Sequence, residues 1–178
     1  AAVIREQRKR KQYVSLIHRL GRRGLAGAVI EGILSSKSEI CAVIDCDLQH
    51  DETKLPEMYS LFEKKPNLDL VVGSRFLNEG DISVGAFSYV RKLGSSLATF
   101  YTKKLLGIKI SDPLSGFFMV KRKSFEQYSK RLQTQGFKVL ADLVASARQN
   151  FVTEEVSYKF KSRFSGESKM TIATGLEL

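Results

Sequence analysis

Two aspartates and a glutamine stand at alternating positions directly after an apolar run, in the segment "AVIDCDLQHDE" at residues 42–52. Asp45, Asp47 and Gln49 offer carboxylate and amide oxygens, which are hard ligands that suit Mg²⁺ or Mn²⁺ better than Zn²⁺. Mg²⁺ usually keeps one or two protein carboxylates and completes its shell with substrate phosphates and water. The segment therefore predicts a divalent-cation site that serves a phosphate-bearing substrate.

The same segment has a second interpretation, in which it is an acidic turn that caps the following helix. Asp51 or Thr53 would then be the N-cap, because the side-chain oxygen of either residue can accept a hydrogen bond from the first turn. The D-x-D spacing alone leaves both interpretations open. His50 is expected to hydrogen-bond behind the ligands, since three oxygen ligands already suffice for the cation.

The elements that must position these residues are indicated by the periodicity of apolar residues. The run before the aspartates is nearly continuous, which is typical of a strand covered on both faces of a parallel sheet. The pattern predicts strands at residues 13–19, 39–47, 68–76, 117–122 and 154–164. It predicts helices at residues 1–11, 24–36, 52–65, 87–107, 124–132 and 137–149, with Pro56 tolerated near the start of its helix.

The alternation of strands and helices predicts an α/β fold with a largely parallel sheet. The 178 residues correspond to one ordinary domain. In such sheets ligands bind beyond the carboxyl ends of the strands, which is where Asp45 and Asp47 stand. Cys41 and Cys46 are predicted to be free thiols, because side chains five residues apart on a strand point to opposite faces.

Basic residues are in excess, with a formal net charge of +10 at pH 7. One basic group lies in residues 1–25 and another in residues 158–169. Such groups attract the phosphates of nucleic acid, anionic lipid or small molecules, although they can also be ordinary solvated surfaces. The chain lacks interleaved aromatic residues and any nucleic-acid motif, so a nucleic-acid-binding module is only a remote alternative and no nucleic-acid partner is expected.

Several motifs occur in a fixed order, namely "DCDLQHDETKLPEM", "DLVVGSRF", "RKLGS", "DPLSGF" and "RFSGESKM". In this order they resemble family 2 glycosyltransferases, and among these the polyprenyl-phosphate (dolichol-phosphate) mannosyltransferases. "GLAGAVIEG" also resembles the run that precedes the D-x-D in that group. The resemblance covers about residues 24–169, and ordered motifs are far more specific than D-x-D alone.

The resemblance implies a GT-A fold, a Rossmann-like nucleotide-diphospho-sugar transferase architecture. It implies an enzyme, a metal-dependent inverting hexosyltransferase that uses Mg²⁺ or Mn²⁺. Such an enzyme would move mannose or glucose from a GDP- or UDP-linked sugar to a polyprenyl or dolichyl phosphate. The alternative is a family 2 enzyme with a saccharide acceptor in cell-surface polysaccharide synthesis. A hydroxyl acceptor needs a general base, and the arginines of "GSRF" and "RKLGS" favour a phosphate acceptor instead.

The resemblance also implies roles for individual residues. The metal on the donor diphosphate would be held by Asp45, Asp47 and Gln49, with Asp45 also binding the donor. The acceptor phosphate would be held by Arg75, Arg91 and Ser95. The sugar side of the donor would be lined by Asp112, Ser115 and Gly116. The donor phosphates would be reached from a loop at residues 162–170 by Arg163 and Lys169. Asp47 and Arg75 are the residues expected to be catalytic.

The chain departs from the family at its start. Members normally begin with a strand carrying P-x-x-N-E and a second strand ending in V-D-D-x-S, and neither motif is found. Residues 1–178 are therefore expected to be a single catalytic domain that is N-terminally incomplete, with a possible membrane segment after residue 178. The helix at 86–107 either suits an interface with anionic lipid or simply covers the core. The expected location is the cytoplasmic face of a membrane. The donor sugar and base, the exact acceptor and the oligomeric state are not determined.

Overall fold

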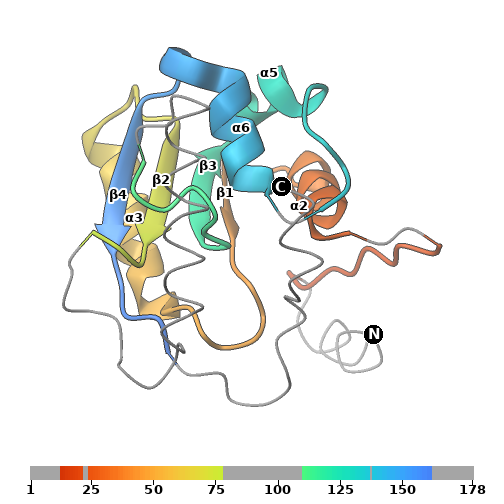
Figure 1. Cartoon of the computed structure of the whole chain (residues 1–178), viewed down its shortest axis with the longest axis horizontal. Helices are drawn as coiled ribbons and strands as arrows, with labels where there is room; N and C mark the ends of the chain where they lie inside the picture. Colours follow the sequence, from red (N-terminus) through yellow and green to blue (C-terminus); the bar gives the residue numbers. More distant parts are fainter. Residues whose placement is uncertain (1–12, 22–23, 78–109, 137, 162–178) are drawn as a thin grey trace, which may run out of the picture.

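The computed structural model describes residues 13–21, 24–77, 110–136 and 138–161 (Figure 1). The strands are β1 (Ile40–Val43), β2 (Leu70–Ser74), β3 (Phe118–Lys121) and β4 (Thr153–Ser157). The α-helices are α2 (Leu25–Ser35), α3 (Leu55–Lys64), α5 (Arg122–Ser129) and α6 (Val139–Ala147). Two short 3₁₀ turns are η1 (Glu52–Lys54) and η2 (Arg148–Asn150). These elements confirm the predicted alternation of strands and helices.

The four strands form one sheet in the order β1-β3-β2-β4. β3 lies antiparallel to both β1 and β2, whereas β2 and β4 are parallel. β1, β2 and β4 therefore run in one direction and β3 in the other. The prediction of a largely parallel sheet is correct for the strand directions. It is wrong for the described pairings, because the reversed β3 is inserted between β1 and β2.

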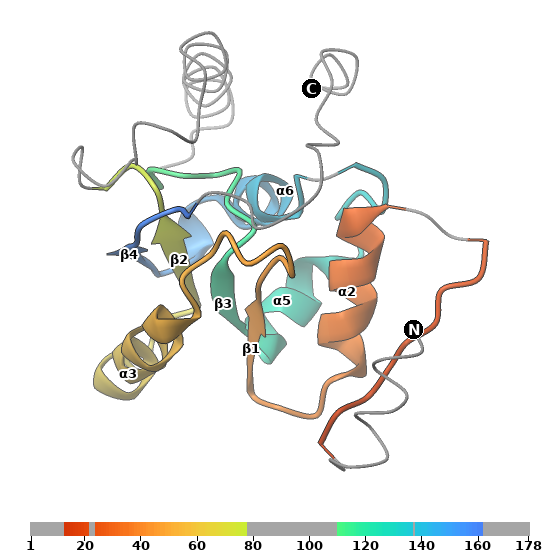
Figure 2. The ribbon, with the colours of Figure 1, turned by 90° about the horizontal axis from the view of Figure 1, so that it is seen from below.

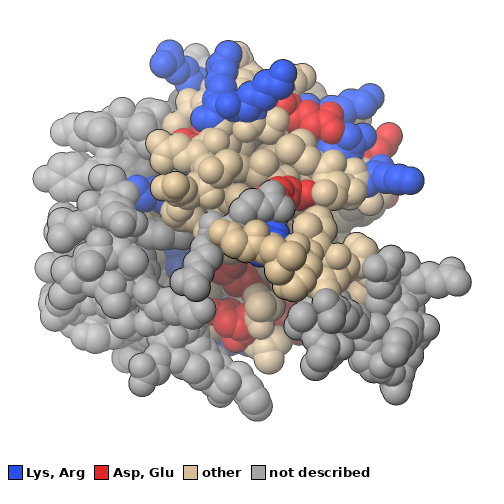
Figure 3. All heavy atoms as spheres, turned by 90° about the vertical axis from the view of Figure 1, so that its right-hand side faces the viewer, with Lys and Arg blue, Asp and Glu red and all other residues tan. Residues whose placement is uncertain are grey.

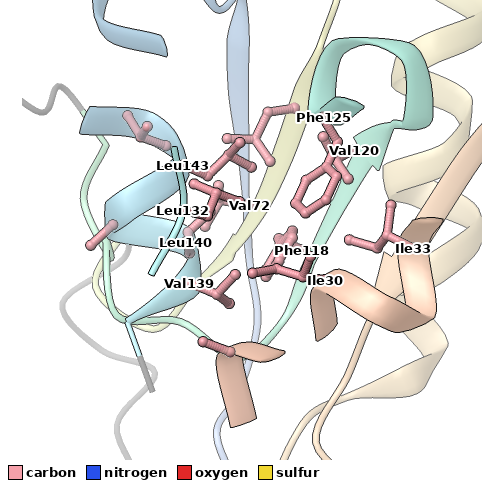
Figure 4. Packing of buried hydrophobic residues seen from close by; sticks show 14 of the residues in the cluster. Ile30, Ile33, Val72, Phe118, Val120, Phe125, Leu132, Val139, Leu140 and Leu143 are labelled. Carbon is pink, nitrogen blue, oxygen red and sulfur yellow. The ribbon is translucent and has the colours of Figure 1, made fainter. Parts of the chain in front are cut away.

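Helices cover the sheet on both faces. Figure 2 shows α3 on one side and α2, α5 and α6 on the other. The larger hydrophobic cluster lies under α2, α5 and α6, where Ile30, Phe118 and Leu140 meet (Figure 4). The smaller cluster lies under α3 and includes Met58 and Phe117. Each cluster removes the apolar face of the sheet from water, which is the main favourable term in the stability of such a layered fold.

β1 and β2 differ in how fully they are covered. All five residues of β2 are buried, as expected for an apolar strand in the middle of the sheet. β1 is at the edge of the described sheet, and its Ala42 and the following Ile44 are exposed. The prediction of a strand covered on both faces is therefore wrong for β1. The apolar run is too short and too near the edge to receive a second covering layer.

The segment at residues 13–19 is irregular, so the strand predicted there is wrong. Its apolar Tyr13 and Ile17 are exposed. Arg19 Nη1 donates to Gly24 O at 2.9 Å, and Arg19 Nε lies 3.3 Å from Glu31 Oε2. The Arg19 side chain thus connects the segment to α2.

Other predictions can be compared in the same way. β4 ends at Ser157, earlier than the predicted strand at 154–164. Cys41 is buried, Cys46 is exposed, and both are free thiols as predicted. The helices predicted at 1–11 and 87–107 lie outside the described residues. Among the residues that the structure does describe, no helix is long and apolar enough to span a bilayer.

Candidate active site

The direction of the strands brings four loops to one edge of the sheet. β1, β2 and β4 end at this edge, and the reversed β3 begins there. The residues that follow or precede these strands include Asp45, Arg75, Gly116 and Tyr158. We call this side the C-terminal edge of the sheet. It is the position at which α/β sheets usually bind ligands.

The acidic turn after β1 presents its polar residues on one side. Exposure alternates along it, with Asp45, Asp47 and Gln49 half-buried and the residues between them exposed. Asp47 Oδ1 accepts a hydrogen bond from the Gln49 backbone N at 3.2 Å, which closes the turn. Leu48 has a positive φ of 63°, a conformation that a leucine seldom adopts. The turn is therefore held by its own polar groups against an unfavourable backbone angle.

Gln49 joins this turn to the chain that follows β4. Its backbone O accepts from Lys161 N at 2.8 Å, and its side-chain Nε2 donates to Lys161 O at 3.1 Å. The second bond turns the amide nitrogen toward Lys161. The acidic turn is thereby tied to the chain that follows β4.

Asp51 lies at the start of the helical segment that follows the acidic turn. Its Oδ1 accepts from Thr53 N at 3.3 Å and from Thr53 Oγ1 at 2.7 Å, so Asp51 is the N-cap of η1. The hydrogen bond from the Thr53 hydroxyl is the main reason that the pKa of Asp51 is lowered. The capping interpretation is therefore correct for Asp51, and it leaves Asp45 and Asp47 for another role.

Arg75 follows β2 and is fixed by Asp112. Arg75 Nε lies 2.7 Å from Asp112 Oδ2, and Arg75 Nη2 lies 2.8 Å from Oδ1, a bidentate arrangement. The Asp112 side chain is 0% exposed and that of Arg75 is 18% exposed. Burial disfavours the charged guanidinium, but the hydrogen bond and charge of Asp112 outweigh it and raise the pKa of Arg75. Three of the five guanidinium N–H donors are not used by Asp112.

The loop before β3 is built around Ser115 and Gly116. The buried Ser115 hydroxyl donates to Gly73 O at 2.7 Å and accepts from Phe117 N at 3.1 Å. Gly116 lies against the Asp45 carboxylate, and a Cβ at this position would stand 3.0 Å from Asp45 Cγ and still closer to Oδ2. A side chain at this position would displace the Asp45 carboxylate from its present place, so the loop and the acidic turn are in contact here.

The same loop is held from β4 by Glu155. Ser111 N donates to both carboxylate oxygens, at 2.8 and 2.9 Å, and Ser111 Oγ donates to Oε1 at 2.6 Å. These bonds fix the residue next to Asp112 and so fix the carboxylate that grips Arg75. Sequence reasoning missed this role of Ser111 and Glu155, because the two residues are 44 positions apart.

Aromatic side chains connect the two halves of the edge. The Phe160 ring lies 5.4 Å from the His50 ring and also 5.4 Å from Arg75 Cζ. Behind it, the Tyr158 hydroxyl lies 2.6 Å from His50 Nδ1. Burial raises the pKa of the Tyr158 hydroxyl, so this group keeps its proton near neutral pH. Tyr158 was also missed, although its alternation with Val156 along β4 could have placed its ring in the core.

The charge distribution agrees with a cation-binding edge. In Figure 3 acidic side chains are visible in the lower half of one face, the end toward which β2 and β4 point in Figure 1, and others lie near the top, where Lys and Arg gather. Within the described ranges, no three His, Cys, Asp or Glu side chains gather closely enough to hold an ion. Two carboxylates and one amide oxygen fit Mg²⁺ or Mn²⁺, which usually complete their shell with substrate phosphates and water.

The structure places seven of the predicted site residues on the same edge of the sheet, together with the partners described above. Asp45 meets Gly116, Arg75 meets Asp112, and Ser115 holds the loop between them. Asp47 and Gln49 share the turn beside Asp45. The predicted residues that lie outside the described part of the chain are Arg91, Ser95, Arg163 and Lys169.

The comparison with known families decides the wider assignment. A family model described as Glycosyl transferase family 2 matches residues 1–129. The chain belongs to glycosyltransferase family 2. The family predicted from the order of the motifs is thereby confirmed. The acidic turn after β1 is the segment that carries the D-x-D pattern.

Curated relatives extend over most of the chain. It is 32% identical over 164 residues to a dolichol-phosphate mannosyltransferase of Pyrococcus furiosus, covering 90% of this chain and 44% of that protein. It is also 32% identical over 163 residues to the dolichol-phosphate mannosyltransferase of Saccharomyces cerevisiae, covering 89% of this chain and 59% of that protein. The chain therefore spans about half the length of the curated relatives it matches.

Solved structures with the same fold include glucosyl-3-phosphoglycerate synthase from Mycobacterium tuberculosis. Its complex with Mn²⁺, UDP-glucose and phosphoglyceric acid matches with a TM-score of 0.58 and 18% identity, covering 82% of this chain and 49% of that one. Its complex with Mg²⁺ and UDP matches with the same TM-score and identity, covering 82% and 48%. At this identity the likeness concerns the fold alone, and it confirms the predicted GT-A class.

Proposed function

We propose that this family 2 chain is part of a metal-dependent inverting glycosyltransferase that moves a hexose from a nucleotide sugar to a polyprenyl or dolichyl phosphate. Mannose and glucose are the favoured sugars, and the donor is GDP- or UDP-linked. The relatives named dolichol-phosphate mannosyltransferase support the lipid acceptor. Because that acceptor is a membrane lipid, the enzyme would work at a membrane surface, on its cytoplasmic face.

The observation that carries the proposal is the pairing of opposite charges on one edge of the sheet. Asp45 and Asp47 follow β1, and the anchored cation Arg75 follows β2. An acceptor phosphate is already an anionic nucleophile, so it needs no general base. It needs a cation that offsets its repulsion from the donor diphosphate. Arg75 keeps donors for this purpose while Asp112 fixes the direction of its guanidinium.

Asp45, Asp47 and Gln49 would hold Mg²⁺ or Mn²⁺ at this edge. Bound there, the cation would stabilise the charge that develops on the leaving nucleoside diphosphate. The contribution of the chain itself is to keep the two carboxylates and the amide on one side of a closed turn. Gly116 provides the space in which the Asp45 carboxylate lies. Residues Asp112, Ser115 and Gly116 would line the sugar side, and Arg91, Ser95, Arg163 and Lys169 would add phosphate contacts.

The test follows radiolabel from donor to product in the full-length enzyme. GDP-mannose and UDP-glucose are supplied separately with dolichyl phosphate, with Mg²⁺, Mn²⁺ or a chelator. We expect label in the organic-extractable lipid with one donor, and none with the chelator. Asp47→Asn should abolish transfer. The matched control is Asp51→Asn, which should retain it, because asparagine also serves as an N-cap.

Three results would count against the proposal. Label that enters a water-soluble saccharide and not the lipid would establish the alternative, a family 2 enzyme of cell-surface polysaccharide synthesis. Full transfer in the presence of chelator would show that the reaction does not depend on a metal. Salt-dependent binding of nucleic acid that Asp47→Asn leaves unchanged, in the absence of any transfer, would favour a binding module.

A further inference from the structure

His50 is a buried polar residue that the proposed chemistry does not use. Its side chain is 4% exposed, and its ring is surrounded by the rings of Phe117, Tyr158 and Phe160 at centroid distances of 5.4 to 5.6 Å. A histidine in such a place loses water on both ring nitrogens, so each nitrogen needs a polar partner. The two partners are the Tyr158 hydroxyl and the Asp45 carboxylate.

The contact between Tyr158 and His50 is linked to the ring nitrogen that carries the proton. The Tyr158 hydroxyl lies 2.6 Å from Nδ1, a short hydrogen-bond distance, and either group can be the donor. A carboxylate beside Nε2 is an acceptor and favours the proton on Nε2, and the Tyr158 hydroxyl then donates to Nδ1. Nε2 lies 3.5 Å from Asp45 Oδ2, so the N–H dipole is beside the carboxylate.

The same carboxylate oxygen has a second neighbour. Oδ2 of Asp45 is the atom that a Cβ on Gly116 would overlap most, whereas Oδ1 is farther from that position, at 3.3 Å. Oδ2 thus lies between the edge of the His50 ring and the backbone of Gly116. The side chain of Asp45 remains 39% exposed on its other side. One oxygen is confined by the fold, and the open side of the carboxylate is available to a ligand.

From this arrangement we propose that His50 is a positioning residue, whose Nε2–H, fixed by Tyr158, holds Oδ2 of Asp45 so that the carboxylate is oriented for a divalent cation before the cation binds. The inference rests on the proposed function for the cation itself. It adds two linked contacts: Tyr158, which follows β4, contacts His50, and His50 contacts Asp45 in the acidic turn. The Nε2–Oδ2 distance of 3.5 Å is a close polar contact. Loss of a supporting contact that orients a metal ligand typically costs about 10- to 100-fold in metal affinity.

The test measures Mn²⁺ binding to the full-length protein by the electron paramagnetic resonance signal of free Mn²⁺, with GDP and then UDP present. His50→Asn retains an amide near Nδ1 but does not reach Asp45, and it should weaken Mn²⁺ binding by about tenfold. His50→Gln places an amide near Nε2 and should restore most of the affinity. His18→Asn is the matched control, because His18 is exposed and is the other histidine of the chain. It should change nothing.

A second pair of variants covers the case in which His50→Asn does not fold. Tyr158→Phe retains the ring and removes only the hydroxyl that fixes the tautomer, so Mn²⁺ binding should weaken by about threefold, less than the loss of the whole contact. Tyr128→Phe is its control, since Tyr128 lies on α5 and packs against Phe151. Mn²⁺ affinity within twofold of wild type in folded His50→Asn, or in Tyr158→Phe where His50→Asn is unfolded, would overturn the proposal.

Asp47→Asn separates this proposal from the proposed function. If Asp47→Asn weakens Mn²⁺ binding and the His50 and Tyr158 variants do not, the metal site stands and the positioning role is wrong. If wild-type protein binds no Mn²⁺ with either nucleotide, the proposed function and this inference both fail. Weakened binding in all three, with rescue by His50→Gln, supports both.

Discussion

The ends of β1 and β2 lie on the same edge of the sheet and are built in opposite ways. After β2, Arg75 is gripped by an Asp112 carboxylate that is 0% exposed, and its geometry is complete without a ligand. After β1, the Asp45 carboxylate is 39% exposed and is confined on one side only. The fold therefore fixes the cationic group by a buried ion pair, whereas it leaves the acidic group partly exposed, as a site for the proposed cation requires.

This contrast follows from the positions of the two strands. β2 is central and buried on both faces, so a charge at its end must be paired. β1 is at the edge of the described sheet, and the carboxylates that follow it remain in contact with water, where charged groups are tolerated. The central strand thus ends in a buried charge pair, whereas the outer strand ends in partly exposed carboxylates, at which the proposed cation would bind.

The largest expected effect is that of Asp47→Asn in the acidic turn after β1, which we call the open end. It removes one charge from the proposed metal site but retains the size of the side chain, so turnover should fall by about 100-fold or more. The melting temperature without ligand should stay equal or rise, because a repulsion between neighbouring carboxylates is relieved. Steady-state kinetics and thermal unfolding of the full-length enzyme check both. Turnover close to that of wild type would show that Asp47 is not a metal ligand.

Asp112→Ala tests the Arg75–Asp112 pair at the end of β2, which we call the closed end. It should mainly affect stability. It leaves the guanidinium of Arg75 largely buried without its partner, which should lower the free energy of unfolding by about 3 kcal/mol. Glu154→Ala is the control, since the Lys65–Glu154 pair is exposed and should cost under about 1 kcal/mol. Denaturant unfolding measures both variants. Equal losses would mean that burial does not distinguish the two pairs.

Two glycine substitutions compare the ends directly. A Cβ on Gly73 would stand 2.5 Å from the buried Phe117 ring, so Gly73→Ala should lower the free energy of unfolding by about 1–3 kcal/mol. A Cβ on Gly116 would displace the half-exposed Asp45 carboxylate, which can rotate toward water. Gly116→Ala should therefore cost less stability than Gly73→Ala and more turnover.

Gly32→Ala is the reference for this comparison. Gly32 lies within α2 with open space around its Cβ position, and the substitution should add about 0.5–1 kcal/mol to the free energy of unfolding. Thermal and denaturant unfolding, with turnover in parallel, rank the three variants. If Gly116→Ala lost stability and retained turnover, the contact between Gly116 and Asp45 would contribute to stability and not to turnover.

The open end was easier to predict from the sequence than the closed end. Asp45, Asp47 and Gln49 stand within five residues of each other, so a local pattern was enough to propose them together as one group. The partners of Arg75 and His50 are 37 and 108 residues away, so no local pattern could pair them. The reversal of β3 was missed for the same reason, because strand direction depends on long-range register. Local periodicity predicted α2, α3 and β2 well.

The smallest expected effect concerns Leu48, which carries the positive φ of the open turn. Its side chain is 63% exposed, so little packing is lost on substitution, while a left-handed conformation costs a leucine about 1–2 kcal/mol. Asparagine tolerates this conformation, and Leu48→Asn should raise the free energy of unfolding by about 0.5–1 kcal/mol. Leu34→Asn, at an exposed position within α2, should lower it, because asparagine is a weaker helix former than leucine. Denaturant unfolding of both variants decides the matter. A loss of stability in both would mean that the backbone angle of Leu48 stores no strain, and the turn that presents Asp47 would then be as relaxed as the closed end.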